Sequence, residues 1–300
     1  MELDRDLFLP VSREDMARRG WDSFDFLLIT GDAYVDHPSF GPTIIGRVLE
    51  AEGFRVAILA QPDWHSAEAF RAMGRPRLGV MIGSGNLDSM VAHYTAAKKR
   101  RSEDFYSPGK KAGLRPDRAV IVYANRAREA FPDLPIIIGG LEASLRRFAH
   151  YDYWEDKVRR SALVDAGADL LVYGMGEYAS IEIAKRLKKK QPVSSMTDIR
   201  GTAFMASDPS ECKFDSVTVP SFEAVSTNME DYANATRVEY EEHDPVRGRA
   251  IIQQHDRRYL IVNPPAMPLS TKELDRVAEL PYTRQYHPMY EALGGVPAIE

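Results

Sequence analysis

Residues 30–41, TGDAYVDHPSFG, place two aspartates, a histidine and a serine between two apolar segments. Carboxylate and imidazole groups bind metal ions, and they also hydrogen-bond to small ligands. Neither a second histidine nor a cysteine lies at ligand spacing near Asp36 and His37, and Pro38 already accounts for a turn. We therefore predict a polar loop whose side chains form hydrogen bonds, and we assign no metal ligand in this chain.

Similar loops follow four further apolar runs, at residues 61–64, 83–89, 139–144 and 174–177. Glycines in such loops let a ligand approach the backbone, and the helix starts beyond them offer free N–H groups to anions. Strand-to-helix turns also need glycine without any ligand. Two interpretations are therefore compatible with these loops: a ligand-binding edge of the sheet, or ordinary turns between strands and helices.

The well-known catalytic and nucleotide motifs are absent. Residues 83–88, GSGNLD, lack the Gly-Lys-Ser/Thr ending of a P-loop, and residues 31–36, GDAYVD, lack the spacing of a dinucleotide-binding turn. There is no G-x-S-x-G elbow for a serine hydrolase. Cys212 is the only cysteine, which excludes an intrachain disulfide and a multi-cysteine metal site built by this chain alone.

Two arginine pairs, at 146–147 and 159–160, flank His150 and a run of aromatic residues at 151–154. This segment is either an arginine-lined ligand or phosphate site, or a helix that packs its aromatic rings inward, and we prefer the helix. The candidate pocket residues all follow the ends of expected strands, and no catalytic residue is assigned among them. They are Asp32, Asp36, His37, Ser39, Asn86, Asp88, Ser89, Gly139, Gly140, Glu142, Ser144, Arg146, Arg147, Gly174, Gly176 and Glu177.

Continuous apolar runs separated by amphipathic segments predict an α/β fold with a doubly wound, mostly parallel, flavodoxin-like sheet. After about residue 205 the pattern changes to short strand-like pieces mixed with prolines and charges. We therefore predict an α/β domain at 1–205 and an extension or linker without its own core at 206–300. The expected strands are 24–30, 54–60, 77–82, 134–138 and 169–173, and the expected helices are 42–52, 66–73, 116–130 and 177–190.

The composition is that of a folded globular chain, with 44% hydrophobic and 28% charged residues. A formal net charge of −5 gives no electrostatic reason to expect a nucleic-acid partner. No run approaches the roughly 18 apolar residues that a membrane helix needs, and no signal-like segment is present. We expect a cytoplasmic location and no membrane partner.

Long stretches of the chain resemble the N-terminal region of the YgiQ family of radical SAM proteins. The stretches are residues 30–64, 83–119, 139–161, 173–177 and 263–290. The resemblance implies a domain like the cobalamin-binding domain of related enzymes, in which Gly139-Gly140 and the turn at 174–177 match recurring turns. It also implies a radical SAM barrel whose three cysteines hold a 4Fe-4S cluster that binds S-adenosylmethionine.

The chain reaches Glu300 without these cysteines. We therefore expect a truncated N-terminal accessory domain that is inactive by itself and contributes a pocket or cap to a missing barrel domain, its partner in cis. The cluster and S-adenosylmethionine belong to the full-length protein. Cobalamin binding is doubtful because the D-x-H-x-x-G pattern is absent around His37. Two alternatives stay open: a stand-alone cobalamin- or nucleotide-binding module, and a structural docking domain without ligand. The sequence identifies neither substrate nor reaction.

Overall fold

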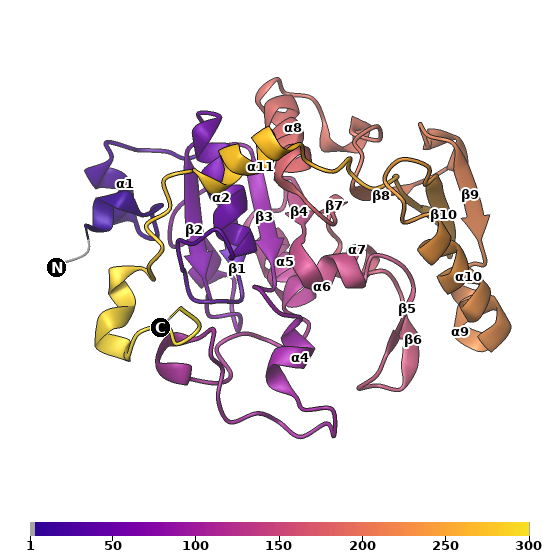
Figure 1. Ribbon diagram of the computed structural model, residues 1–300, viewed down its shortest axis with the longest axis horizontal. Helices are drawn as coiled ribbons and strands as arrows, with labels where there is room; N and C mark the ends of the chain where they lie inside the picture. The colour runs from indigo at the N-terminus through magenta and orange to yellow at the C-terminus, as the bar shows by residue number, and fades with distance from the viewer. Residues whose placement is uncertain (1–3, 300) are drawn as a thin grey trace. The chain divides into compact units, whose positions relative to one another are not determined.

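A computed structural model describes residues 4–299 of the chain, which divide into two compact units. Unit 1 comprises residues 1–136, 140–142 and 269–300, and unit 2 comprises 137–139 and 143–268. No helix within the described range is both long and apolar enough to cross a membrane. Each unit has its own hydrogen-bonded strands (Figure 1).

Unit 1 is built on three parallel strands in the order β2-β1-β3. Because the chain moves from β1 to β2 in one direction and from β2 to β3 in the other, right-handed crossovers place the connecting helices on opposite faces. In agreement, α2 packs on β1 and β2, whereas α3 packs on α5 and α5 packs on β3. The bounds are β1 Phe26–Thr30, α2 Gly41–Ala51, β2 Val56–Ala60, α3 Glu68–Arg71, β3 Gly79–Gly83 and α5 Ala119–Ala130.

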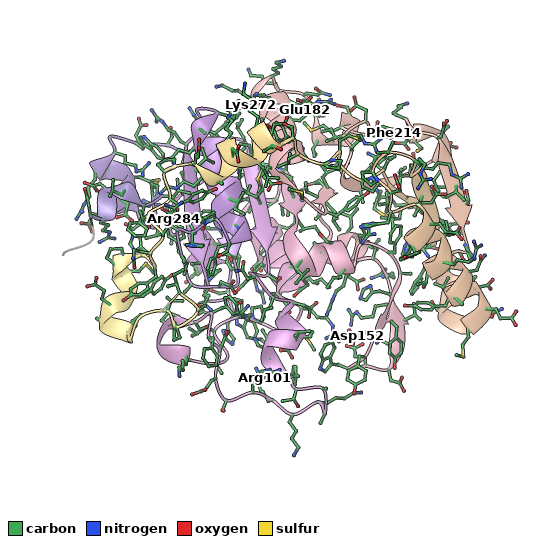
Figure 2. The ribbon with its side chains drawn as sticks, in the orientation of Figure 1. Arg101, Asp152, Glu182, Phe214, Lys272 and Arg284 are labelled. Carbon is green, nitrogen blue, oxygen red and sulfur yellow. The ribbon has the colours of Figure 1, made fainter. Side chains whose placement is uncertain are left out.

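The end of the chain is tied to the loop that follows β1. The backbone N–H of Arg284, labelled in Figure 2, donates to the carbonyl of Asp36 at 2.8 Å, and the N–H of His287 donates to the carbonyl of Tyr34 at 3.0 Å. The Tyr290 hydroxyl accepts the N–H of Tyr34. The other elements of unit 1 are η1 Arg5–Leu7, α1 Arg13–Arg18, α4 Ser89–His93, η2 Pro108–Lys110, α11 Thr271–Ala278 and η5 Pro288–Leu293.

Unit 2 has a mixed sheet. β4 pairs in parallel with β7, and β8, β11 and β10 follow in antiparallel pairs, after which β9 pairs in parallel with β10. A separate antiparallel hairpin is formed by β5 and β6. The strands are β4 Ile136–Ile138, β5 His150–Asp152, β6 Lys157–Arg159, β7 Leu170–Val172, β8 Thr202–Ala206, β9 Ser216–Val219, β10 Ala250–His255 and β11 Arg258–Val262. The helices are α6 Gly140–Leu145, which begins in unit 1, α7 Ala162–Ala166, α8 Glu177–Lys188, η3 Val193–Ser195, η4 Pro209–Glu211, α9 Phe222–Thr227 and α10 Met229–Glu241.

The α/β class is confirmed, and each expected strand and helix is present within a few residues of its predicted bounds. Three expectations differ from the structure. Residues 206–268 are not a coreless extension, because they supply β9, β10 and β11, whose Ile251 and Leu260 are buried in unit 2. The two units do not divide at residue 205. Within the segment at 146–160, residues 150–159 form a β-hairpin instead of a helix, and Tyr151 and Tyr153 are exposed.

Candidate functional site

In unit 1 the loops after β1 and β3 meet at the point where the strand order reverses, which is where open α/β sheets usually bind ligands. The Asp32 carboxylate accepts the backbone N–H of Asn86 at 2.6 Å. The Asn86 side chain donates to the carbonyl of Ser39 at 3.0 Å and accepts the N–H of Gly41 at 3.4 Å. Three predicted pocket residues, Asp32, Ser39 and Asn86, therefore lie together.

The same place is occupied by a buried arginine of the chain itself. Arg115 is fully buried and pairs with Asp32 at 2.8 Å and with Asp104 at 2.6 Å. Burial raises the pKa of Asp32 to about 6, against the opposing effects of the Arg115 guanidinium and the Asn86 N–H. Asp32 and Asp104 thus neutralise a guanidinium group in the position that a ligand would enter.

Two glycines allow this close approach of the loops. A Cβ at Gly31 would lie 2.1 Å from the carbonyl oxygen of Ser84, and one at Gly85 would lie 2.1 Å from Asp32 Oδ1. Gly85 also has a φ of +107°, which other residues rarely adopt. These glycines serve contacts within the chain.

Asp36 and His37 have separate surroundings although they are neighbours in sequence. Asp36 is buried, pairs with Arg47 at 2.5 Å and accepts the N–H of Thr283 at 2.9 Å. His37 is partly exposed, and its Nδ1 lies 2.7 Å from Ser39 Oγ. No group of three or more metal-ligating side chains occurs in the part of the chain that the structure describes.

Glu142 connects the starts of two helices in unit 1. Its carboxylate accepts the N–H of Ser89 at 2.8 Å and that of Val120 at 3.0 Å. Ser89 Oγ accepts the N–H of Ala119 at 3.1 Å, and Asp88 caps α4 by accepting the N–H of Met90. These carboxylates and the hydroxyl satisfy helix N-termini that an anion would otherwise contact.

A histidine and aspartate pair beside this cluster was not predicted. His93 Nδ1 lies 2.6 Å from one carboxylate oxygen of Asp117, and the Tyr94 hydroxyl donates to the other at 2.7 Å. Burial alone would raise the pKa of Asp117, but hydrogen bonds from His93 and Tyr94 hold it below its usual value. Within residues 4–299, the buried Nε2 of His93 has no hydrogen-bond partner. A carboxylate-oriented imidazole can transfer a proton, but the spacing of 24 residues gave no sequence signal.

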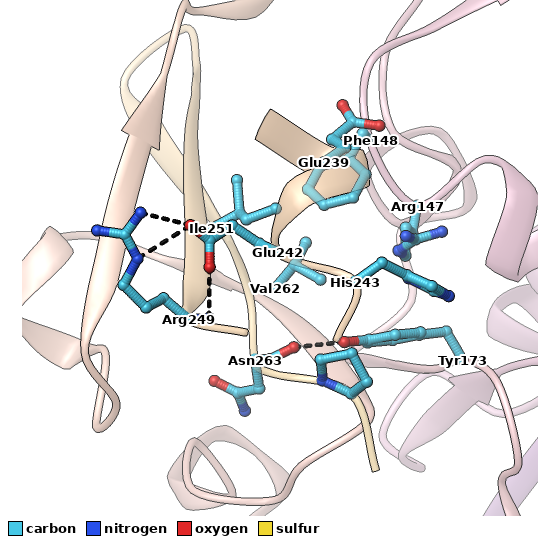
Figure 3. Close-up of a pocket in the computed structure, with 11 residues that line it drawn as sticks. Arg147, Phe148, Tyr173, Glu239, Glu242, His243, Arg249, Ile251, Val262 and Asn263 are labelled. Carbon is cyan, nitrogen blue, oxygen red and sulfur yellow. Dashed lines mark hydrogen bonds and ion pairs between the residues drawn. The ribbon is translucent and has the colours of Figure 1, made fainter. Parts of the chain in front are cut away.

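In unit 2 a small hollow lies at the carboxyl ends of β7 and β11, which run in the same direction because each is antiparallel to β8. Its empty volume is about 200 Å³, including the opening to solvent. Figure 3 shows Arg147, His243 and Tyr173 together on one side, and the Glu242 and Arg249 pair on the other. The lining is completed by Phe148, Glu239, Ile251, Val262, Asn263 and Pro265.

Arg147 is held in this hollow by two aromatic rings and a backbone carbonyl. Its guanidinium carbon lies 4.8 Å from the ring centroids of both Phe148 and Tyr173, and Nη1 donates to the carbonyl of Ser144 at 2.6 Å. Burial lowers the pKa of Arg147. Burial also raises the pKa of Glu239 to about 7, although the charge of Arg147 opposes this shift.

The other predicted residues from the loops after β4 and β7 do not line the hollow. Ser144 Oγ accepts the N–H of Gly174 at 3.3 Å, and the carbonyl of Arg146 accepts the N–H of Ala162. A Cβ at Gly139 would lie 3.2 Å from the carbonyl of Val172. The remaining three positions are Gly140, with a φ of +79°, Gly176 at the N-cap of α8, and Glu177, the first residue of that helix.

Comparison with known proteins gives a family match over almost the whole chain. A family described as "Radical SAM N-terminal" matches residues 8–300. A UPF0313 protein of Clostridium botulinum (strain ATCC 19397 / Type A) is 57% identical over 98% of this chain and 45% of its own length. A UPF0313 protein of Clostridium perfringens (strain 13 / Type A) is 53% identical over 98% of this chain and 44% of its own length. The chain therefore spans about half the length of these curated relatives.

Among solved structures, the radical S-adenosylmethionine methyltransferase TsrM from Kitasatospora setae, determined with cobalamin and a 4Fe-4S cluster bound, is similar at 20% sequence identity. The alignment has a TM-score of 0.40 and covers 61% of this chain and 27% of TsrM.

Proposed function

Since the chain belongs to the Radical SAM N-terminal family, as its sequence predicted, we propose that it is the docking and ligand-binding part of a longer radical SAM protein. The observation that carries this proposal is the match over residues 8–300 in relatives that are more than twice as long. In this proposal the reactive cluster belongs to the remaining part of those proteins.

The donor set of this chain does not fit a radical SAM cluster. Three cysteine thiolates hold such a cluster, with the fourth iron left for S-adenosylmethionine. Cys212 is the only cysteine of the sequence, and the described residues contain no cluster of metal-ligating side chains. We therefore place the 4Fe-4S cluster and S-adenosylmethionine outside this chain and assign none of its residues to them.

The hollow also does not fit cobalamin. Ligand pockets usually enclose about 300–1,000 Å³ even for drug-sized molecules. The hollow around Arg147 has about 200 Å³, including its opening. His37 Nδ1 is already engaged by the Ser39 hydroxyl and backbone N–H. We therefore propose that the chain binds a small ligand and contacts another protein surface, and we do not propose that it binds a corrin.

The proposed contact surface is the apolar part of unit 2 near the carboxyl end of β7. Leu145, Met175 and Tyr178 are exposed there, with Leu145 at 62%. The hydrogen bond between Ser144 and Gly174 joins the two segments that carry these side chains. Large apolar side chains gathered in one place favour a contact with another protein surface. We assign this surface to the remaining part of the full-length protein.

Hydrogen exchange tests this assignment. A chimera is made in which this chain replaces the matching 45% of the C. botulinum UPF0313 protein. We expect slower amide exchange at residues 143–145 and 174–178 in the chimera than in the isolated chain. Helix α10, which carries the exposed Met229 and Tyr240, is the internal control and is expected to exchange equally in both.

Equal exchange of residues 143–145 and 174–178 in a folded chimera would contradict the proposed contact surface. Protection of α10 instead would move the contact to another part of unit 2. Either result leaves the family membership intact, because that rests on the sequence match.

A further inference from the structure

We propose that the hollow in unit 2 binds the oxyanion group of a small ligand, a carboxylate or a phosphate, through the guanidinium of Arg147. This inference deepens the ligand-binding role proposed above and rests on it.

Unlike two other buried arginines, Arg147 has no carboxylate paired with it in the described part of the chain. The buried Arg47 pairs with Asp36 at 2.5 Å, and the buried Arg115 pairs with Asp32 and Asp104. Arg147 forms no ion pair with any residue in the described range, although it is largely buried. Glu239 acts on Arg147 through its charge without forming an ion pair, so a bound anion would lower the cost of removing this guanidinium from water.

Two aromatic rings hold the guanidinium of Arg147 in position. The Phe148 and Tyr173 rings hold its carbon at 4.8 Å from each centroid, so that its plane is fixed by packing. Nη1 is used by the carbonyl of Ser144, whereas Nε is buried and has no hydrogen-bond partner within residues 4–299. The edge formed by Nε and Nη2 is the fork that binds carboxylate or phosphate through two parallel hydrogen bonds.

The charged side chains that line the hollow leave little to repel an anion. Glu242 is already neutralised by Arg249, whose Nε and Nη2 both donate to that carboxylate. Glu239 is the remaining carboxyl group of the lining, and burial raises its pKa to about 7. His243 adds an imidazole that can donate to an oxyanion. The lining therefore opposes an anion only through Glu239.

The size of the hollow limits what enters it. The empty space of about 200 Å³ includes open solvent, so at most the end group of a ligand would enter the hollow and the rest would extend outward. The probes are therefore sodium phosphate and sodium acetate, used separately with the 300-residue chain. Choosing both separates a preference for phosphate from one for carboxylate.

Binding is followed by the side-chain Nε–H resonance of Arg147 in ¹⁵N spectra and by calorimetry at constant ionic strength. We expect saturable movement of this resonance with at least one of the two anions. The resonance is assigned by its disappearance in Arg147→Lys. Arg147→Gln is expected to lower the calorimetric affinity by about tenfold or more, because charge-assisted bidentate bonds are lost. Arg237→Gln is the charge-matched control on an exposed pair with Glu241, and its affinity is expected to be unchanged.

Glu239→Gln provides a second, independent readout, since it removes the opposing carboxylate while keeping the shape of the lining. We expect it to strengthen anion binding about threefold, in line with the removal of one like charge near the site. The proposal is overturned if neither anion moves the Arg147 resonance, or if Arg147→Gln and Arg237→Gln change the affinity equally. Loss of anion binding would leave the exchange protection expected at the contact surface unaffected, so the two proposals fail separately.

Discussion

At the scale of single residues, Arg115 holds the loops of unit 1 together. It is fully buried between Asp32 and Asp104, and it also lies 3.3 Å from the carbonyl of Ser84. Removing one partner of a buried ion pair leaves the other charge without compensation, which costs about 3–5 kcal/mol. We expect Arg115→Met to lower the free energy of unfolding by this amount in urea titrations monitored by circular dichroism.

The pH dependence of this loss of stability shows whether it comes from the unpaired charge or from lost packing. Burial raises the pKa of Asp32 to about 6, so lowering the pH from 8 to 5 protonates it in the folded chain. The destabilisation by Arg115→Met is therefore expected to be smaller at pH 5 than at pH 8. Arg75→Met, which breaks an exposed pair with Asp133, should change stability little at either pH. A loss that is equal at both pH values would show that lost packing is the cause.

The burial of His287 predicts a second pH effect, in which the stability of the wild-type chain falls as the pH is lowered. Burial lowers its pKa to about 4, from an ordinary value of 6.5. Between these values the unfolded chain binds a proton that the folded chain does not, so the stability contributed by neutral His287 is complete above pH 6.5 and is lost toward pH 4. Linkage gives a loss of about 2 kcal/mol between pH 7.5 and pH 5.

The variant His287→Asn removes this titration and keeps an acceptor for the N–H of Met289, which His287 Nδ1 accepts in the folded chain. We expect the fall in unfolding free energy between pH 7.5 and pH 5 to be about 2 kcal/mol smaller in this variant than in the wild type. His65→Asn, at an exposed position, is the control and should keep the wild-type slope. Identical slopes for all three proteins would refute the assignment.

At the scale of elements, the approach of the β1 and β3 loops depends on Gly31. An added Cβ would meet the backbone of Ser84 at 2.1 Å, and a backbone atom cannot move aside as a flexible side chain can. We expect Gly31→Ala to destabilise unit 1 by about 2 kcal/mol or more, as overpacking does. Gly41→Ala, at the first residue of α2 with no atom within 4 Å of the new Cβ, is the matched control. Its stability should be unchanged or slightly higher, because alanine favours helix.

The elements that the sequence predicted are those with long apolar runs or clear helical periodicity. Residues 116–130 were correctly assigned to a helix despite their β-branched centre, and α5 begins at Ala119. The buried core after residue 205 was not predicted, because prolines and charges interrupt the flanks of its strands. These strands become buried in unit 2 by pairing with strands that are distant in the sequence. The hairpin at 150–159 was predicted as a helix, although the alternation of Tyr151, Asp152 and Tyr153 is typical of a strand.

That the predicted residues form a ligand site stays a prediction, whereas the structure shows their partners within the chain. Loops at the carboxyl ends of strands were correctly identified as the places where polar side chains gather. Asp32, Asp36 and Glu142, however, are engaged by Arg115, Arg47 and backbone N–H groups that lie far away in sequence. The partners of a carboxylate depend on tertiary contacts, so no local motif reveals whether it binds a ligand or the chain itself. Arg147 was named from its sequence neighbours, whereas Glu239 and His243 come from α10 and the residues after it.

At the scale of the whole molecule, we propose that the reactive centre lies outside this chain. The sequence match places this chain in a radical SAM family, while its single cysteine leaves it without the ligands of the cluster. The isolated chain and its chimera with the C. botulinum relative should therefore differ in chemistry as well as in surface protection.

Anaerobic reconstitution with iron and sulfide, followed by assay of S-adenosylmethionine cleavage, tests this separation most directly. We expect the chimera to form a 4Fe-4S cluster and to release 5′-deoxyadenosine, and the isolated chain to do neither. Formation of a 4Fe-4S cluster that cleaves S-adenosylmethionine on the isolated chain would contradict the account.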